Sequence, residues 1–408
     1  MLKSLAVDYA GDAIGVILSG GDSDGSLGIQ AIKHEGGIVF AQDPDFARFG
    51  DMPRHAIETG FVDRVLSPKE IASELVRLSR QSSSSDAAPG SGTAEEDTFL
   101  KRIFQRLRAA HGLDFTHYKR STLRRRLDRR MTLHGIESLR EYAERIDRDP
   151  AESAALYQDF LIRVTEFFRD PASFDVLRRQ VFPALREGRD LREPIRIWVP
   201  GCATGEEVYS LAIELLDWIG NRVVPSEAQI FGTDVSEAAL EKARAGIYQA
   251  NALRDVSSER RQRFFEKHDD HFRVVKEIRD LCIFARQDVT YDPPFSRLDL
   301  ISCRNLLIYL DDVAQRRTLQ SFHFALQPHG VLIIGPAESI GSSELFDRVD
   351  KRFRIFRRRP GSGAGRGAGG TRPCRRRRPR APGPATPPWS WCPPPGTCSR
   401  TAGTARRW

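Results

Sequence analysis

The chain of 408 residues is long enough for at least two domains, and its hydrophobic content of 40% is typical of a globular protein. The net charge of +8 does not indicate a nucleic-acid-binding protein, because residues 360–408 hold ten arginines and no acidic residue, and subtracting those ten charges leaves −2. No run of about 18 apolar residues predicts a membrane helix, and the six cysteines form no CxxC pair. We therefore expect a cytoplasmic monomer without a metal site, a disulfide framework or direct membrane insertion.

Residues 1–80 alternate strand-like and helix-like segments. Ile14–Leu18 and Gly37–Ala41 are short apolar runs beside glycines, which predict buried strands. Gly25–His34 and Pro68–Ser79 have the apolar spacing of helices. These residues therefore predict a small α/β domain, and residues 81–96, which begin with a stretch rich in Ser, Ala, Gly and Pro, predict a linker.

Residues 97–187 predict a small helical domain, because apolar residues recur every four positions, as in Phe99, Ile103 and Leu107. The run Lys119–Arg130 is strongly basic. Leu123, Leu127 and Met131 share one helical face, so we expect the basic side chains to form an outer ridge that faces solvent.

Residues 188–359 again alternate strands with helices, which predicts a doubly wound, mostly parallel sheet. The expected strands are Ile195–Val199, Gln229–Thr233, Leu281–Ala285, Leu298–Ser302 and Val331–Ile334. Residues 360–408 consist mostly of Arg, Pro, Gly and Ala without an apolar period, and we expect this tail to be disordered.

The loop after the first strand of this sheet, Pro200–Glu207, indicates a cofactor site. Its glycines allow a ligand to approach the backbone at the start of a helix. It is neither the GxGxxG of a dinucleotide fold nor a P-loop. Two glutamates at its end favour a ligand with positive charge, as in S-adenosylmethionine. An alternative is that Glu206 and Glu207 only interact with the helix dipole.

Acidic residues also follow the next two strands. Asp234 ends the second strand, where an acid commonly binds the hydroxyl groups of a ribose. Asp288 follows the third strand, where its carboxylate has the position to accept a hydrogen bond from an adenine amino group. Both residues fit the binding of a nucleoside cofactor.

Four spaced motifs make residues 97–359 resemble the chemotaxis receptor glutamate methyltransferases of the CheR type. The motifs are Val164–Asp170, Pro200–Glu207, Gly232–Asp234 with Glu241–Tyr248, and Cys303–Tyr309. The resemblance implies an S-adenosylmethionine-dependent methyltransferase fold, α/β with an all-α N-terminal subdomain.

The resemblance also implies site residues and a partner. Thr165, Arg169 and Tyr309 would line the methyl-transfer site. The partner would be the helical cytoplasmic region of a chemoreceptor, docked on the helix around Lys119–Arg130, and no nucleic acid is expected. The implied cofactor-binding residues are Gly201, Thr204, Gly205, Glu206, Asp234, Asp288, Arg304 and Asn305.

Ser19–Gly25 and Met52–Ile57 resemble the C-terminal half of receptor methylesterases of the CheB type. That family uses a Ser-His-Asp triad, and Asp24 matches its aspartate. The serine and the histidine would precede Met1, and neither His34 nor His55 matches a triad position. We therefore expect a partial methylesterase domain without esterase activity, within a fragment of a CheB/CheR fusion.

Two other functions stay open at this point. Asp292–Phe295 resembles the DPPY/F signature of adenine-N6 DNA methyltransferases, although here it precedes the fourth strand instead of ending it. A protein that binds S-adenosylmethionine as a non-catalytic sensory adaptor is the other possibility. A turn rich in proline is the simpler interpretation of Asp292–Phe295.

Overall fold

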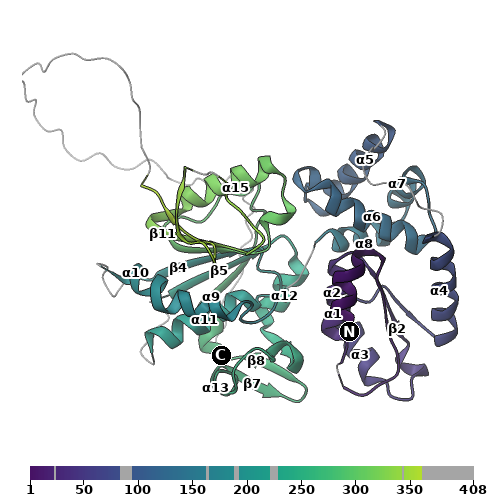
Figure 1. Cartoon of the computed structure of the whole chain (residues 1–408), viewed down its shortest axis with the longest axis horizontal. Helices are drawn as coiled ribbons and strands as arrows, with labels where there is room; N and C mark the ends of the chain where they lie inside the picture. Colours follow the sequence, from purple (N-terminus) through teal and green to yellow (C-terminus); the bar gives the residue numbers. More distant parts are fainter. Residues whose placement is uncertain are drawn as a thin grey trace, which may run out of the picture. The chain divides into compact units, whose positions relative to one another are not determined.

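The computed structural model describes residues 1–22, 24–82, 94–161, 165–187, 193–220, 228–341 and 344–360 (Figure 1). Residues 361–408 of the expected tail and residues 83–93 of the expected linker lie outside this range. Helix α4 continues to Ser82, and helix α5 begins at Ala94. The predicted domain boundaries otherwise stay a prediction.

The N-terminal segment, residues 1–82, contains a parallel sheet in the order β1-β2-β3. Strand β2 is buried along its whole length because helices pack on both of its faces. Val39 and Ala41 belong to one apolar cluster with Ile29, whereas Phe40 belongs to another with Ile71. The elements are α1 (Leu2–Tyr9), β1 (Ile14–Ile17), α2 (Ser26–His34), β2 (Ile38–Gln42), α3 (Asp51–Glu58), β3 (Arg64–Leu66) and α4 (Pro68–Ser82).

The next part of the chain is all-helical, as predicted. Leu107, Leu123 and Phe160 meet in its apolar core. The side chain of Asp149 caps the last of its four main helices by accepting hydrogen bonds from the backbone at N2 and N3, with Pro150 at N1. The helices are α5 (Ala94–His111), α6 (Arg120–His134), α7 (Leu139–Arg148) and α8 (Pro150–Phe160), followed by the shorter α9 (Pro171–Val176) and α10 (Phe182–Arg186).

The large sheet has the strand order β12-β13-β11-β10-β4-β5-β9. All five predicted strands are confirmed, and they form a continuous parallel block. Two antiparallel strands that the sequence did not predict extend one edge. The bounds are β4 (Ile195–Pro200), β5 (Ala228–Asp234), β9 (Cys282–Arg286), β10 (Leu298–Cys303), β11 (Leu326–Ile334), β12 (Phe346–Asp350) and β13 (Ile355–Arg358).

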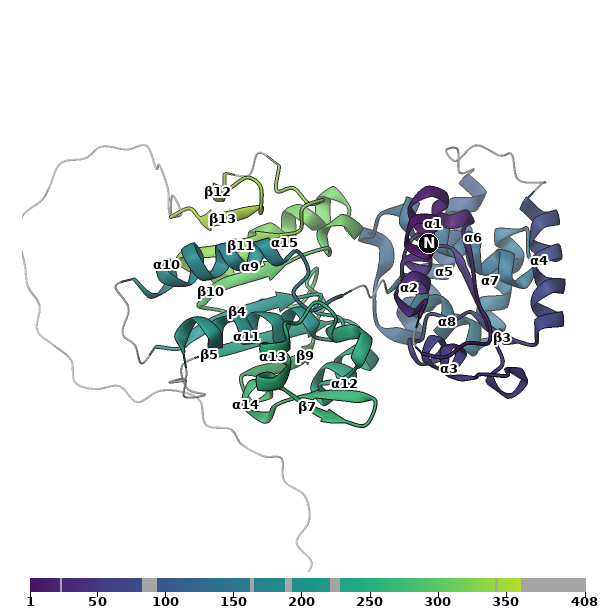
Figure 2. The same ribbon diagram turned by 60° about the horizontal axis from the view of Figure 1, so that its bottom comes forward.

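Helices cover both faces of this sheet (Figure 2). Successive side chains of a strand point to opposite faces. Ile197 and Val199 therefore pack with helix α11, whereas Trp198 packs with Phe322 of helix α15. The helices are α11 (Glu206–Ile219), α12 (Glu237–Ala245) and α15 (Asp312–Ala325). This is the doubly wound arrangement, with the strand ends carrying the predicted site residues at one edge.

A small antiparallel sheet of order β6-β8-β7 is inserted between β5 and β9. Phe264, Phe265 and Val274 attach it to the apolar core of the large sheet. Its elements are β6 (Ile247–Gln249), α13 (Ser258–Phe264), β7 (Phe265–His268), β8 (His271–Val274) and α14 (Lys276–Arg279).

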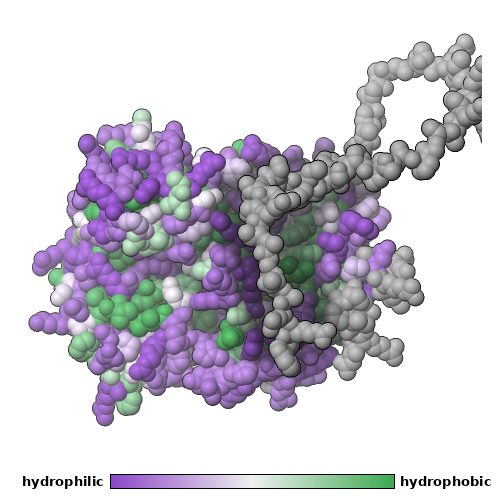
Figure 3. All heavy atoms as spheres, turned by 180° about the vertical axis from the view of Figure 1, so that it is seen from behind, coloured by the Kyte–Doolittle hydropathy of each residue, from purple (hydrophilic) through white to green (hydrophobic). Residues whose placement is uncertain are grey.

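The surface of the described residues is mainly polar. The face in Figure 3 is mostly hydrophilic, and its apolar residues show as separate patches. Among the residues that the structure describes, no helix has the length and apolar character to cross a membrane.

Candidate active site

The loop between β4 and α11 has the backbone conformation expected of a ligand-binding turn. Gly201 and Gly205 have φ angles of +69° and +94°, which residues other than glycine rarely adopt. A Cβ atom on Gly205 would lie 2.9 Å from that of Ala243, so a larger residue does not fit. Asp234 fixes the loop to the end of β5 by accepting a hydrogen bond of 2.9 Å from the Ala203 amide.

Glu206 is buried at the first position of α11. Its carboxylate accepts hydrogen bonds of 2.7 and 2.9 Å from the Thr204 hydroxyl group and a further one from Thr165. Burial raises the pKa of Glu206 to about 7 despite these bonds, because water is withdrawn from the charged form. A positively charged ligand beside this carboxylate would restore the charge balance.

One pocket brings together six of the predicted site residues. Its lining includes Arg169, Gly201, Asp234, Arg304, Asn305 and Tyr309. Thr165 contacts Glu206, and it is not part of the lining. Thr204, Gly205 and Glu206 lie in the adjoining loop, outside the lining of this pocket. Whether each residue has its predicted role stays a prediction.

Arg169 is held at the pocket from two sides. With the amide oxygen of Asn305 turned toward it, both terminal nitrogens of Arg169 lie 3.0 Å from that oxygen. Arg304 donates a hydrogen bond of 3.0 Å to the Arg169 carbonyl and forms an ion pair with Asp170. Phe168 and Asp170 on either side have φ angles of +50° and +58°. Such conformations cost about 1–3 kcal/mol each and are concentrated at functional sites.

Tyr309 is positioned by the segment that leads into helix α6. The Lys119 amide donates a hydrogen bond of 2.8 Å to the Tyr309 carbonyl, and Tyr118 pairs with Leu310 as an antiparallel bridge. Burial raises the pKa of Tyr309 to about 12, so its hydroxyl group is protonated at neutral pH. The helical domain thus contributes directly to the wall of the pocket.

Asp288 lies in a neighbouring pocket with Arg108, Asp114 and Tyr291. Burial raises the pKa of Asp288, whose carboxylate accepts hydrogen bonds from the Thr290 amide and hydroxyl group. Both pockets share Val235 in their linings, so Asp288 and Arg169 lie in adjoining spaces.

Sequence reasoning missed Tyr118 and Glu338 at this site and gave His34, which also lines the pocket, no role in it. Tyr118 lines the pocket of Arg169, and burial together with the charges of Asp288 and Asp234 raises its pKa. Glu338 accepts hydrogen bonds of 3.0 and 2.7 Å from the amides of Asn305 and Leu307 and so shapes the loop that carries Tyr309. The position of Glu338 shortly after β11 was its only signal in the sequence, and Tyr118 had no such signal.

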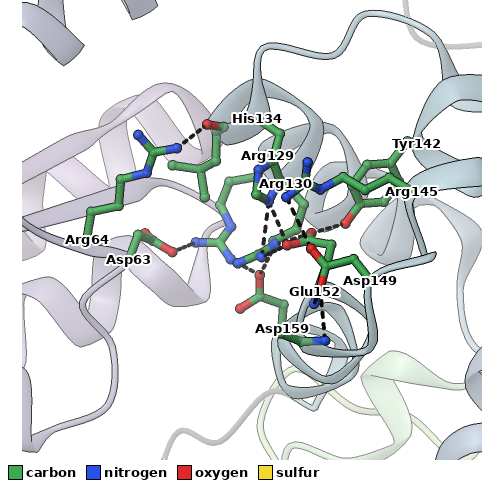
Figure 4. Close-up of polar contacts among 12 residues, drawn as sticks. Asp63, Arg64, Arg129, Arg130, His134, Tyr142, Arg145, Asp149, Glu152 and Asp159 are labelled. Atoms are coloured by element: carbon green, nitrogen blue, oxygen red, sulfur yellow. Dashed lines mark hydrogen bonds and ion pairs between the residues drawn. The ribbon is translucent and has the colours of Figure 1, made fainter. Parts of the chain in front are cut away.

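The predicted basic ridge on α6 is partly wrong. Arg126 and Arg129 are each only 4% exposed. Arg129 forms ion pairs with Asp63 and Asp159, which Figure 4 shows on opposite sides of its guanidinium group. Arg129 points inward because these buried carboxylates neutralise it, whereas Arg126 points inward to donate hydrogen bonds to the backbone carbonyls of His34 and Asp159. The exposed Arg120 keeps the predicted orientation.

The remaining motif residues, Asp24 and Phe295, make local or packing contacts. Asp24 is exposed and accepts a hydrogen bond from the amide of Gly25 within its own turn. Phe295 of the DPPF sequence stacks on Phe231 with ring centroids 4.5 Å apart and contacts Trp198 edge-on. It therefore belongs to the core of the sheet, and the motif precedes β10, as the sequence predicted.

Comparison with protein families assigns the three parts of the chain. Residues 99–161 match "CheR methyltransferase, all-alpha domain", and residues 163–355 match "CheR methyltransferase, SAM binding domain". Residues 1–75 match "CheB methylesterase". The cofactor of the matched domain is thus S-adenosylmethionine, as predicted.

Relatives agree with this assignment. A "Putative methyltransferase Cher3" of Pseudomonas putida is 31% identical over 273 residues, which are 64% of this chain and 97% of that protein. A "Chemotaxis protein methyltransferase" of Listeria innocua is 34% identical over 233 residues, 56% of this chain and 85% of that protein. The chain belongs to the CheR methyltransferase family and carries a CheB methylesterase segment before its CheR domains.

A longer relative matches nearly the whole chain. The "Uncharacterized 104.1 kDa protein in hypE 3'region" of Rhodobacter capsulatus is 36% identical over 382 residues, which are 88% of this chain. The chain spans 40% of the length of that protein.

Proposed function

We propose that the protein methylates glutamate side chains of a chemoreceptor-like protein, with S-adenosylmethionine as methyl donor. The observation that carries this proposal is the convergence of Arg169, Asn305 and Tyr309 with the glycine loop and Asp234 in one pocket. When bound, S-adenosylmethionine supplies a methyl group on a positively charged sulfur, which a carboxylate accepts as a methyl ester while S-adenosylhomocysteine is released.

The residues present fit such a cofactor. Gly201 lets a ligand approach the backbone, and Asp234 lies at the end of the second parallel strand, where a ribose is commonly bound. Glu206 is a buried acid whose pKa is raised, and a cationic ligand would stabilise its charged form. We assign Asp288 to the adenine end because its pocket adjoins the first.

A glutamate substrate needs positioning more than proton transfer. Its carboxylate is ionised at neutral pH and is already a nucleophile, so no general base is required. Arg169 has the planar donor fork that binds carboxylates, and Asn305 and Arg304 hold it in place. Holding the reacting groups together in this way lowers a barrier by several kcal/mol.

The test is methyl labelling. The protein is incubated with methyl-labelled S-adenosylmethionine and host lysate, and the products are treated with base, which releases methanol from methyl esters. We expect volatile label from a receptor band, at least 100-fold less with Arg169→Ala because a positioning contact is lost, and no change with Arg140→Ala, whose side chain is exposed on α7. Base-stable label in DNA would favour the adenine-N6 alternative, and cofactor binding without transfer would favour the adaptor.

We further propose that the CheB segment has no esterase activity. Among the described residues, the Asp24 carboxylate accepts a hydrogen bond from the adjacent Gly25 amide and none from a histidine, and an aspartate that orients no histidine does not activate a nucleophile. Release of methanol from methylated receptor by this chain would refute the proposal. A monomer that acts without nucleic acid remains our expectation.

A further inference from the structure

The CheB segment reaches the pocket of the CheR domains through helix α2. His34, the last residue of α2, is part of the lining that contains Arg169, Asn305 and Tyr309. Its Nε2 atom lies 3.0 Å from the hydroxyl oxygen of Tyr309, 275 residues further along the chain. A histidine that matches no esterase triad position thus touches a predicted residue of the methyl-transfer site.

The second ring nitrogen of His34 decides the direction of this hydrogen bond. Nδ1 lies 3.0 Å from a carboxylate oxygen of Glu35, and an ionised carboxylate only accepts hydrogen bonds. Burial lowers the pKa of His34, which favours a neutral ring at pH 7. The one hydrogen of the neutral ring is therefore on Nδ1, and Nε2 accepts the hydrogen of the Tyr309 hydroxyl group.

His34 is held firmly in this position. Arg126 of α6 donates hydrogen bonds of 2.9 and 3.0 Å to the carbonyl groups of His34 and Asp159. The preceding residue, Lys33, forms ion pairs with Asp63 and Asp159, both of which also pair with Arg129. Charged groups buried in this way are strongly disfavoured from separating, because each would be left without a partner.

We propose that His34 is a positioning residue for the methyl-transfer site, which orients the hydroxyl group of Tyr309 so that only its oxygen lone pairs face the pocket. Lone pairs suit a positively charged methyl donor and do not bind the anionic carboxylate of the substrate. The CheB segment would then complete the CheR site. This inference rests on the proposed function, because it concerns the same pocket.

Three variants test it with methyl transfer to receptor as readout. His34→Leu removes the acceptor, and we expect kcat to fall about five- to tenfold, the effect of one hydrogen bond, with KM for receptor changed less than about twofold. His34→Gln restores an acceptor oxygen, and we expect it to recover most of kcat. In Tyr309→Phe the hydroxyl group is absent, so adding His34→Leu should cause no further loss.

The control is His55→Leu, because His55 lies on α3 and contacts the carbonyl of Asp22. We expect this variant to keep wild-type kcat. An unchanged kcat in folded His34→Leu, an equal loss in His34→Gln, or additive losses with Tyr309→Phe would each overturn the proposal.

A measurement without substrate separates this inference from the proposed function. In the ¹⁵N-labelled full chain, the imidazole signals of His34 are assigned by their loss in His34→Gln. We expect Tyr309→Phe to shift the Nε2 signal of His34 and to leave His55 unchanged, whether or not the chain methylates receptors. An unshifted His34 signal would show that the contact is absent and would overturn the proposal.

Discussion

The buried ionic cluster of Lys33, Asp63, Arg129 and Asp159 permits a quantitative prediction. Two positive and two negative side chains balance within it, and those of Arg129 and Asp63 are only 2% and 1% exposed. Replacing Arg129→Met keeps much of the side-chain volume but removes the cation that pairs with both carboxylates, leaving Lys33 and, 3.8 Å from Asp159, Arg130 as their positive partners. Breaking a buried pair by removing one partner costs about 3–5 kcal/mol, so we expect a loss of that size in the free energy of unfolding.

The matched control is Arg120→Met on the same helix. Arg120 pairs with Asp97, and their side chains are 65% and 41% exposed, so the loss should be at most about 1 kcal/mol. Both variants are measured by urea unfolding followed by circular dichroism. Adding Asp63→Asn to Arg129→Met rebalances the charge, and this double variant should be more stable than Arg129→Met alone. Equal stability of the two single variants, or no recovery in the double variant, would refute the reasoning.

The same cluster predicts a pH dependence. Burial alone would raise the pKa of Asp159, but Arg129, Lys33 and Arg130 outweigh it, and the pKa is lowered from its usual 3.8. An acid with a lowered pKa stabilises the folded state above its unfolded pKa, and this contribution disappears as the pH falls through the folded value. We therefore expect the stability difference between wild type and Arg129→Met to shrink below about pH 4.

Two predictions concern the cofactor loop. Because burial raises the pKa of Glu206 to about 7, we expect the affinity for S-adenosylmethionine to rise about fivefold from pH 6 to pH 7 as the carboxylate ionises. Calorimetry measures this affinity, and Glu206→Gln should bind more weakly and without the pH dependence. An equal pH dependence of the affinity in the variant would contradict the assignment. Gly205→Ala combines a φ angle of +94° with a Cβ contact at 2.9 Å, whereas Gly60→Ala has a φ angle of +75° and no atom within 4 Å. Thermal unfolding should show a larger loss for Gly205→Ala, by at least about 1 kcal/mol, and equal losses would show that the contact is unimportant.

The fold was largely predictable because its main elements are local in origin. Each predicted strand of the large sheet is a run of mostly apolar residues. Such a run can be recognised in the sequence without knowing which strand it pairs with. Strands β12 and β13 were missed because they are short and charged residues interrupt their apolar pattern. Phe346 is the only buried residue of β12, and its charged neighbours Asp347 and Arg348 read as a loop. Strand β12 is defined by its antiparallel pairing with β13. The sequence of one segment alone does not reveal which other segment it pairs with.

The candidate site was predictable where a motif carries it and not where tertiary contacts build it. Arg169, Asp234 and Tyr309 lie in recognisable motifs, and the structure brings them into one pocket. Tyr118 joins them only because its segment pairs with Leu310. The spacing of apolar residues on α6 predicted that every arginine faces solvent. That prediction was wrong for Arg129 because its acidic partners come from distant parts of the chain.

The ionic cluster and the pocket are physically continuous. The side chain of Asp159 accepts a hydrogen bond from the guanidinium group of Arg129, and its backbone carbonyl accepts one from Arg126. Arg126 in turn holds the carbonyl of His34, the residue that contacts Tyr309. A change that loosens the cluster should therefore also release His34, so Arg129→Met is expected to lower kcat in the same direction as His34→Leu. On this view a segment related to an esterase supports the neighbouring site through packing and charge.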